Sequence, residues 1–319
     1  MQKRIAVAGY TLVGLGLVAG CDPIDRLVEP PLSAEEAARS IASSRFGDWS
    51  APVNLGPTVN SPFTEFGPAL WRDGQSLYFT SDRPGGLGGL DLWVARRGSE
   101  QEPWGTPVNL GAPVNSPSNE VAPNFSRDGH LLLFTSSRPG GSGGNDLWVS
   151  RRADVNDDFA WADPENLGAP INAPGFDAGP NLQLPELYLA SDRVSGNLDI
   201  FVARLGPGGD FGPPALLPEL SSPFDDARPS PTFDGLEIFF HSARPGGLGG
   251  VQDIWMSTRA SKAARWEDPV NLGPGINSAF LEVQPFISTD GLTLLFSSTR
   301  PGGSGFLDLY MATRSIGGR

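Results

Sequence analysis

The sequence predicts an all-β chain that folds as a five-bladed β-propeller of four-stranded antiparallel blades. A motif that runs Ser-x-Arg-Pro-Gly-Gly and ends in an aspartate and an aromatic residue occurs five times, the third copy in degraded form. The motif aspartates are spaced by 55, 53, 54 and 55 residues. Each period holds four short runs rich in β-branched, aromatic and leucine residues, separated by turn residues, which is typical of one propeller blade.

Within each period the elements follow one order. An outer strand of the type WSAPVNLG (49–56) leads into a loop that ends in an acid, and the innermost strand follows. In four repeats Asp-Gly comes next, which favours a hairpin because glycine tolerates the positive φ of such turns. A third strand of the type SLYFTS (76–81) precedes the glycine loop, and DLWVARR (91–97) forms the fourth strand.

The order of strands also predicts how the ring closes. The chain begins with an outer strand at residue 49 and ends with a strand at 308–314 that lacks an outer neighbour. Pairing of residues 48–55 with 307–314 would complete the last blade and remove two open sheet edges. We therefore expect the propeller to span residues 46–319.

The N-terminus predicts an exported chain. Lys3 and Arg4 precede an uncharged stretch at 5–20, whose 16 residues are too few to span a bilayer as a helix. We interpret residues 1–20 as a signal peptide. Residues 21–45 are expected to form a tether with a short helix, because SAEE at 33–36 has the pattern of a capping box.

Composition limits the partners of the exported chain. Removal of the signal peptide leaves 21 basic against 36 acidic residues, a net charge of −15. Nucleic acid is therefore excluded as a partner, since phosphate binding needs a basic face. A single cysteine, Cys21, excludes a disulfide framework within one chain. We expect a monomer without a cofactor.

Two resemblances extend this interpretation. The stretches NFSRDG (124–129), FTSSRPGG (134–141) and DLW (146–148) resemble the WD-like β-propeller repeat of the TolB type, over about residues 46–315. LVAGC at 17–21 resembles the lipobox of bacterial lipoproteins, in which Cys21 would be the acylated N-terminus. An ordinary secreted protein with a chance cysteine is the alternative.

The TolB resemblance implies a protein that acts in binding or assembly at the bacterial envelope. Together with the lipobox it implies a lipid anchor facing the periplasm, on the inner or outer membrane, or a position on the cell surface. We therefore expect a non-catalytic scaffold that presents its loop-rich face to an envelope protein or a cell-wall component.

The glycine loop suggests a charged cluster in each blade. An acid at the start of the innermost strand, the motif arginine and the motif aspartate should lie on one face. We expect the arginine to bridge both carboxylates as a staple; the alternative is that the ring of charges binds a ligand. The five sets are Glu65, Arg83 and Asp91; Glu120, Arg138 and Asp146; Asp177, Arg193 and Asp199; Asp226, Arg244 and Asp253; and Glu282, Arg300 and Asp308.

One feature is not repeated. In DVNDDFAWADPE (154–165), Asp154, Asn156, Asp158 and Glu165 occupy positions 1, 3, 5 and 12 of a calcium-binding loop. The sixth position, normally glycine, is Phe159, so this is a weak metal candidate. A solvated acidic insertion is the competing interpretation.

Catalysis has little support in the sequence, and we expect that the protein is not an enzyme. The two histidines fall in different repeats, and no serine lies in a G-x-S-x-G motif. The alternative function is a carbohydrate-binding or glycoside-hydrolysing propeller. Glycoside hydrolysis uses a pair of carboxylates, and the nearest candidates are the acids at the starts of the innermost strands.

Overall fold

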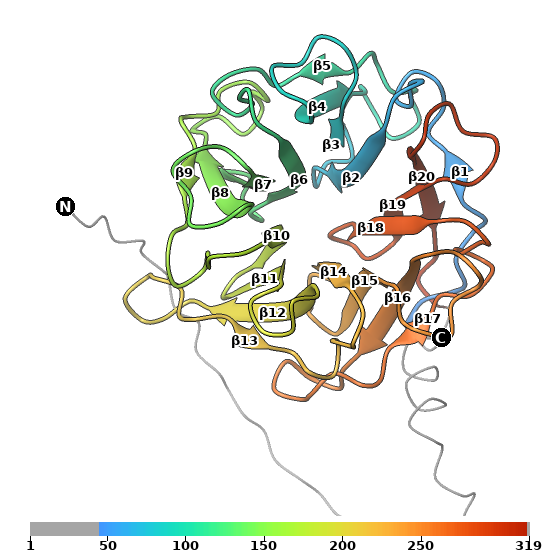
Figure 1. The fold of residues 1–319 in the computed structure, drawn as a ribbon. Coiled ribbons are helices and arrows are strands. Elements are labelled where there is room, and N and C mark those ends of the chain that lie inside the picture. The colour runs from blue at the N-terminus through green and yellow to red at the C-terminus, as the bar shows by residue number, and fades with distance from the viewer. Residues whose placement is uncertain (1–44, 318–319) are drawn as a thin grey trace, which may run out of the picture.

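A computed structural model describes residues 45–317, which form five antiparallel sheets arranged around a central axis (Figure 1). The prediction of an all-β, five-bladed propeller is confirmed. The signal peptide, Cys21, the tether and its helix lie outside the described residues. Within the described part of the chain, no helix is long and apolar enough to cross a membrane.

Each blade runs outward from the channel as four strands. Blade 1 contains β2 (Glu65–Leu70), β3 (Ser76–Ser81), β4 (Asp91–Arg96) and β5 (Val108–Asn109). Blade 2 contains β6 (Glu120–Phe125), β7 (Leu131–Ser136), β8 (Asp146–Arg151) and β9 (Glu165–Asn166). Blade 3 contains β10 (Asp177–Gln183), β11 (Glu186–Ser191), β12 (Asp199–Arg204) and β13 (Ala215–Leu216). Blade 4 contains β14 (Asp226–Pro231), β15 (Glu237–Ser242), β16 (Asp253–Thr258) and β17 (Val270–Asn271).

Blade 5 is assembled from both ends of the propeller. It contains β18 (Glu282–Ile287), β19 (Thr293–Ser298), β20 (Asp308–Thr313) and, as its outer strand, β1 (Val53–Asn54). Val53 pairs with Met311 and Asn54 with Tyr310, and an isolated bridge joins Phe46 to Ile316. The predicted closure is therefore present, through an outer strand of only two residues.

The second strand of each blade forms the core. In β3 every residue is buried, because the strand has a neighbour on each edge and an adjacent blade against each face. The contact between blades 1 and 2 is rich in aromatic rings: Tyr78 and Trp71 pack edge-on against Phe125 at 4.7 and 5.4 Å between ring centroids. Such pairs add stability beyond the area that they bury.

The innermost strands share a β-bulge. Their pairing with the second strand shifts register two residues after the initial acid, for example between Phe66 and Ala69. The third residue of each innermost strand has a left-handed backbone, with φ between 57° and 61°. These five residues are Gly67, Ala122, Gly179, Arg228 and Gln284. Three of them are not glycine, so the bulge is imposed on residues that seldom adopt it.

Candidate functional site

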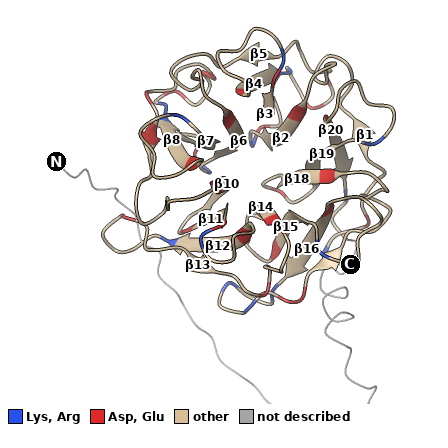
Figure 2. Cartoon of the chain, viewed as in Figure 1, with Lys and Arg blue, Asp and Glu red and all other residues tan. Residues whose placement is uncertain are grey.

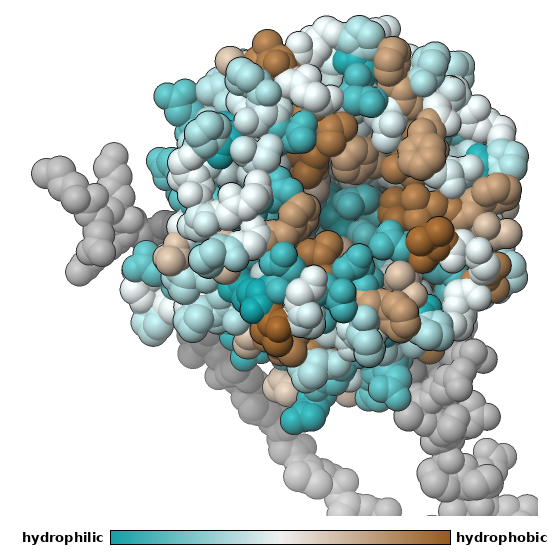
Figure 3. Space-filling model, in the orientation of Figure 1, coloured by the Kyte–Doolittle hydropathy of each residue, from teal (hydrophilic) through white to brown (hydrophobic). Residues whose placement is uncertain are grey.

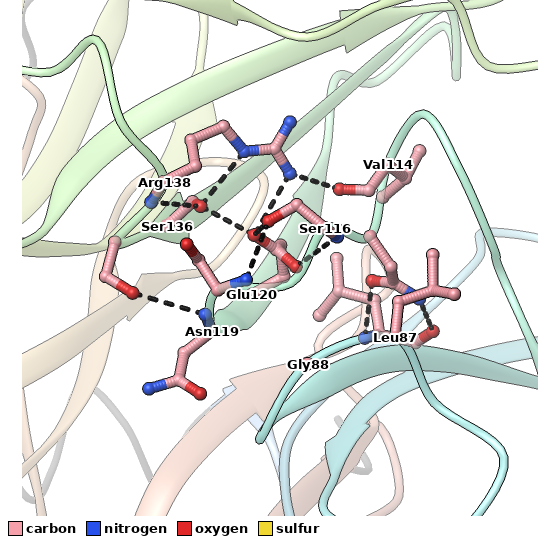
Figure 4. A network of polar contacts seen from close by, with 12 residues as sticks. Leu87, Gly88, Val114, Ser116, Asn119, Glu120, Ser136 and Arg138 are labelled. Carbon is pink, nitrogen blue, oxygen red and sulfur yellow. Dashed lines mark hydrogen bonds and ion pairs between the residues drawn. The ribbon is translucent and has the colours of Figure 1, made fainter.

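Each blade contains an ion pair between the initial acid of its innermost strand and the motif arginine. In blade 2, Glu120 accepts hydrogen bonds from the backbone N–H and hydroxyl of Ser116 and from Ser136 Oγ, and lies 3.1 Å from Arg138 Nη2 (Figure 4). The equivalent pairs are Arg83–Glu65 at 2.8 Å, Arg193–Asp177 at 2.5 Å, Arg244–Asp226 at 2.6 Å and Arg300–Glu282 at 3.0 Å.

The motif aspartate does not join this ion pair, which corrects the expectation of an arginine bridging two carboxylates. Asp91 accepts hydrogen bonds from Leu87 N at 2.5 Å and Gly88 N at 3.3 Å, and from Asn109 Nδ2 at 3.3 Å. The glycine loop thus wraps around the carboxylate with its backbone N–H groups. The equivalent buried aspartates are Asp146, Asp199, Asp253 and Asp308.

These two networks leave no carboxylate free for a ligand. The acids lie at the starts of innermost strands such as β6 and β18 (Figure 2), but all five are fully buried, and so are the five aspartates. Serine, arginine, asparagine and backbone groups donate to these carboxylates, and Asp146 Oδ1 and Asp253 Oδ1 are buried without a hydrogen-bond partner among the described residues. The predicted charged ring is therefore a set of internal contacts in the described structure.

Glycine is required where the loop meets the aspartate. A Cβ built on Gly86 would lie 1.8 Å from Asp91 Oδ2. We expect Gly86→Ala to lower the free energy of unfolding by about 1–3 kcal/mol through overpacking. Gly275→Ala is the matched control, because nothing lies within 4 Å of the added atom. Urea unfolding of the two variants measures the difference; equal stabilities would refute the role of the loop.

The weak calcium candidate does not assemble as a metal site. Asp158 is buried and accepts from Ser76 Oγ at 2.9 Å, Arg96 Nε at 2.6 Å and Arg152 Nη1 at 3.0 Å. No cluster of three or more histidine, cysteine or acidic residues that could hold a metal is found in residues 45–317. Of the other proposed calcium ligands, Asp154 accepts a hydrogen bond from the backbone N–H of Asn156, and Glu165 lies in β9.

Asp158 instead supplies a missing counter-ion between blades. At two other blade contacts, an arginine after the third strand pairs with a glutamate that begins the second strand of the preceding blade: Arg259 with Glu186, and Arg314 with Glu237. Blade 1 has Ser76 at that position. The insertion in blade 2 therefore brings its own carboxylate to Arg152.

This role predicts that calcium does not affect stability. Addition of Ca²⁺ or of EDTA should leave the thermal midpoint unchanged, since two arginines already donate to the Asp158 carboxylate. Asp158→Asn should lower the free energy of unfolding by roughly 2 kcal/mol or more, because Arg152 would remain buried without a counter-ion. Differential scanning fluorimetry tests both, and a midpoint that rises with Ca²⁺ would restore the metal interpretation.

The accessible candidate site is the mouth of the central channel on the face of the glycine loops. A cavity of about 290 Å³ is lined there by the starts of the innermost strands and by the loops around them. Its wall is mainly apolar. The lining residues are Phe66, Leu90, Asn119, Val121, Ala122, Asn145, Phe176, Ala178, Gly179, Ala190, Leu198, Ala227, Arg228, His241 and Gln284. Figure 3 shows one face of the disc, where hydrophobic side chains border a hydrophilic central hollow.

Arg228 crosses the channel beneath this cavity. From blade 4 it donates to the carbonyls of Ala122 and Pro123 in blade 2, both at 2.8 Å, and to that of Pro68 in blade 1 at 3.4 Å. Only 3% of the residue is exposed, and this burial lowers the pKa of its guanidinium to about 9. The cavity therefore has a cationic floor.

His241 and Gln284 form the wall beside this arginine. His241 Nδ1 lies 3.3 Å from the backbone N–H of Gln284 and must accept its hydrogen, which assigns the ring proton to Nε2. Burial, and next the charge of Arg228, lower the pKa of His241 to about 3, so the ring is neutral. Gln284 Oε1 is buried and has no hydrogen-bond partner among the described residues.

None of these three residues was identified as a site residue from the sequence. The signal was present as differences between aligned repeats. Two residues after the initial acid, blades 1 to 5 have in order Gly, Ala, Gly, Arg and Gln. At the position of His241 they have Thr, Thr, Ala, His and Ser. Such departures from the repeat mark the side chains that face the channel, whereas the repeated charges mark internal contacts.

No family model matches the chain, and no curated protein is similar to it in sequence. Several solved structures share its fold. The catalytic domain of a family 62 α-L-arabinofuranosidase from Coprinopsis cinerea superposes with a TM-score of 0.53 at 16% identity, over 85% of this chain and 98% of that one. An α-L-arabinofuranosidase from Lactobacillus brevis superposes with a TM-score of 0.52 at 14% identity, over 82% of this chain and 92% of that one. A thermostable family 43 glycoside hydrolase superposes with a TM-score of 0.55 at 11% identity, over 84% of this chain and 96% of that one.

These similarities correct the functional expectation. Several structural neighbours are described as glycoside hydrolases, which contradicts the expectation of a non-catalytic scaffold that is not an enzyme. A protein described as TolB from Agrobacterium tumefaciens also matches, at 15% identity over 84% of this chain and 98% of that one. Its TM-score of 0.49 is too low to support a relationship beyond the shared propeller.

Proposed function

We propose that the protein is carbohydrate-active and that the cavity at the loop-bearing mouth of the channel is its sugar site. The observation that carries the proposal is this cavity, at the centre of a propeller whose structural neighbours include arabinofuranosidases matched over nearly their whole length. Its volume of about 290 Å³ is close to the lower end of small-ligand pockets. The site suits a single sugar unit of a larger chain.

The chemistry of the wall fits sugar recognition. Phe66 and Phe176 supply aromatic surface, and Asn119, Asn145 and Gln284 supply amide groups that can both donate and accept hydrogen bonds. Hydrolysis would in addition need two carboxyl groups across the scissile bond, and none of the lining residues is Asp or Glu. We therefore assign recognition to this cavity, and the test below measures turnover separately.

The test fills the cavity. A glycan array that includes arabinan and xylan oligosaccharides identifies a binding sugar, and calorimetry measures its affinity for the wild type and two variants. Ala178→Leu, in the cavity wall, should weaken binding at least tenfold. Ala160→Leu, at an exposed loop residue, should leave it unchanged. Absence of any sugar binding, or equal affinities for both variants, would refute the proposal. Release of sugar by the wild type would show in addition that carboxylates elsewhere carry out hydrolysis.

We also propose that the chain is a lipoprotein of the cell envelope, anchored through Cys21. The support is the LVAGC sequence after an uncharged stretch that follows two basic residues. Expressed in bacteria with a radiolabelled fatty acid, the wild type should be labelled and found with membranes. Cys21→Ser should be unlabelled, and labelling of that variant would contradict the anchor.

A further inference from the structure

Arg228 differs from the other buried and half-buried arginines of the propeller. The five motif arginines, and Arg152, Arg259 and Arg314, each lie within 4 Å of a carboxylate. Within residues 45–317, no such carboxylate partner is found for Arg228, and its hydrogen bonds are to neutral carbonyl oxygens. Those bonds use three of its five N–H groups. A buried, uncompensated charge is costly to keep.

The groups around this charge are also arranged as donors. Because His241 Nδ1 accepts from the backbone of Gln284, its Nε2 carries a hydrogen. Among the described residues no acceptor is found for that N–H. The Asn119 and Asn145 amides can also donate, Gln284 adds a buried acceptor, Oε1, that has no partner among the described residues, and no lining side chain is anionic. The cavity therefore offers positive charge and N–H groups that a ligand could satisfy.

We propose that this cavity binds the carboxylate of an acidic sugar, such as a uronate, with Arg228 as its counter-ion. This inference rests on the proposed carbohydrate function and names the class of sugar. The apolar side chains Phe66, Val121 and Leu198 would pack on the ring, while the carboxylate approaches the floor. A low-dielectric wall strengthens the interaction between the carboxylate and the guanidinium.

Two arginine variants form a matched pair. Arg228→Gly removes the charge at a left-handed position where blades 1 and 3 already have glycine, so the fold should tolerate it. Arg265→Gly removes the same charge from an exposed residue that does not line the cavity. Calorimetry then compares D-glucuronate, D-glucose and cyclohexanecarboxylate on the wild type and on both variants, with thermal midpoints as a check on folding.

The wild type should bind glucuronate at least tenfold more tightly than glucose. Arg228→Gly should abolish that ratio, and Arg265→Gly should keep it. A purely structural arginine would change the midpoint but not the ratio. Equal binding of the acid and neutral sugars would overturn the inference and leave the proposed function standing. Arg228-dependent binding of cyclohexanecarboxylate without sugar binding would refute the sugar assignment alone, and no binding of any probe would refute both.

Discussion

Replacing Arg314 with methionine is expected to lower the free energy of unfolding by about 3–5 kcal/mol, because Glu237 would be left buried without its counter-ion. Arg314 forms an ion pair with Glu237 of blade 4, and both side chains are almost fully buried. Its guanidinium also donates to the Gly291 carbonyl at 2.7 Å and lies 3.7 Å from the ring centroid of Phe46. One side chain thus joins blade 4, blade 5 and the segment that closes the ring.

Chemical unfolding of three variants separates charge from packing. The double variant R314M/E237L should recover most of the loss, since an apolar pair avoids the desolvation of both charges. Arg265→Ala is the control: Arg265 is 89% exposed and 3.6 Å from Glu219, so its removal should cost less than about 1 kcal/mol. A loss for R314M no larger than for the control would show that the pair does not hold the ring closed.

Replacing His241 with threonine is expected to make the protein less sensitive to acid. In the folded chain the pKa of His241 is about 3, because of burial and the charge of Arg228, against about 6.5 when unfolded. Between these pH values the unfolded chain binds one more proton than the folded chain. The free energy of unfolding therefore falls as the pH falls, by about 1.4 kcal/mol per pH unit from this group.

The threonine variant is suggested by the chain itself. Thr80 and Thr135 occupy the same position in blades 1 and 2, where each hydroxyl accepts from the left-handed residue of the next blade. Relative to pH 7.5, the wild type at pH 4.5 should lose about 3 kcal/mol more than His241→Thr. Urea unfolding across this range gives both slopes. Parallel slopes would mean that the histidine is protonated in the folded protein.

The sequence predicted the architecture because the architecture is repeated. The five regularly spaced aspartates marked the start of one strand in each blade. The unpaired first strand indicated that the ring closes by pairing it with the last blade. The arginine and the first carboxylate were placed together correctly. The second carboxylate was misplaced because residue types alone did not show that the backbone of the glycine loop would coordinate Asp91. Asp158 was read as an exposed acid because its partners, Ser76 and Arg96, belong to another blade.

The channel residues were missed for a conformational reason. The backbone of an arginine or glutamine rarely adopts the left-handed conformation. Nothing in the residue types of Arg228 and Gln284 therefore indicates the bulge that turns them toward the axis. Function was misjudged because repeated charges stand out more in a sequence than a few residues that break the repeat. In this propeller, those exceptions line a cavity on the loop-bearing face.

The way the chain enters the disc has a consequence for its orientation. Arg45 contacts Asp234 and Phe46 packs beside Gly291, and both partners lie in hairpins between the first and second strands. Those hairpins are on the side opposite the cavity. The chain therefore joins the disc on the side opposite the cavity, and an attachment made through its N-terminal segment would not cover the cavity mouth.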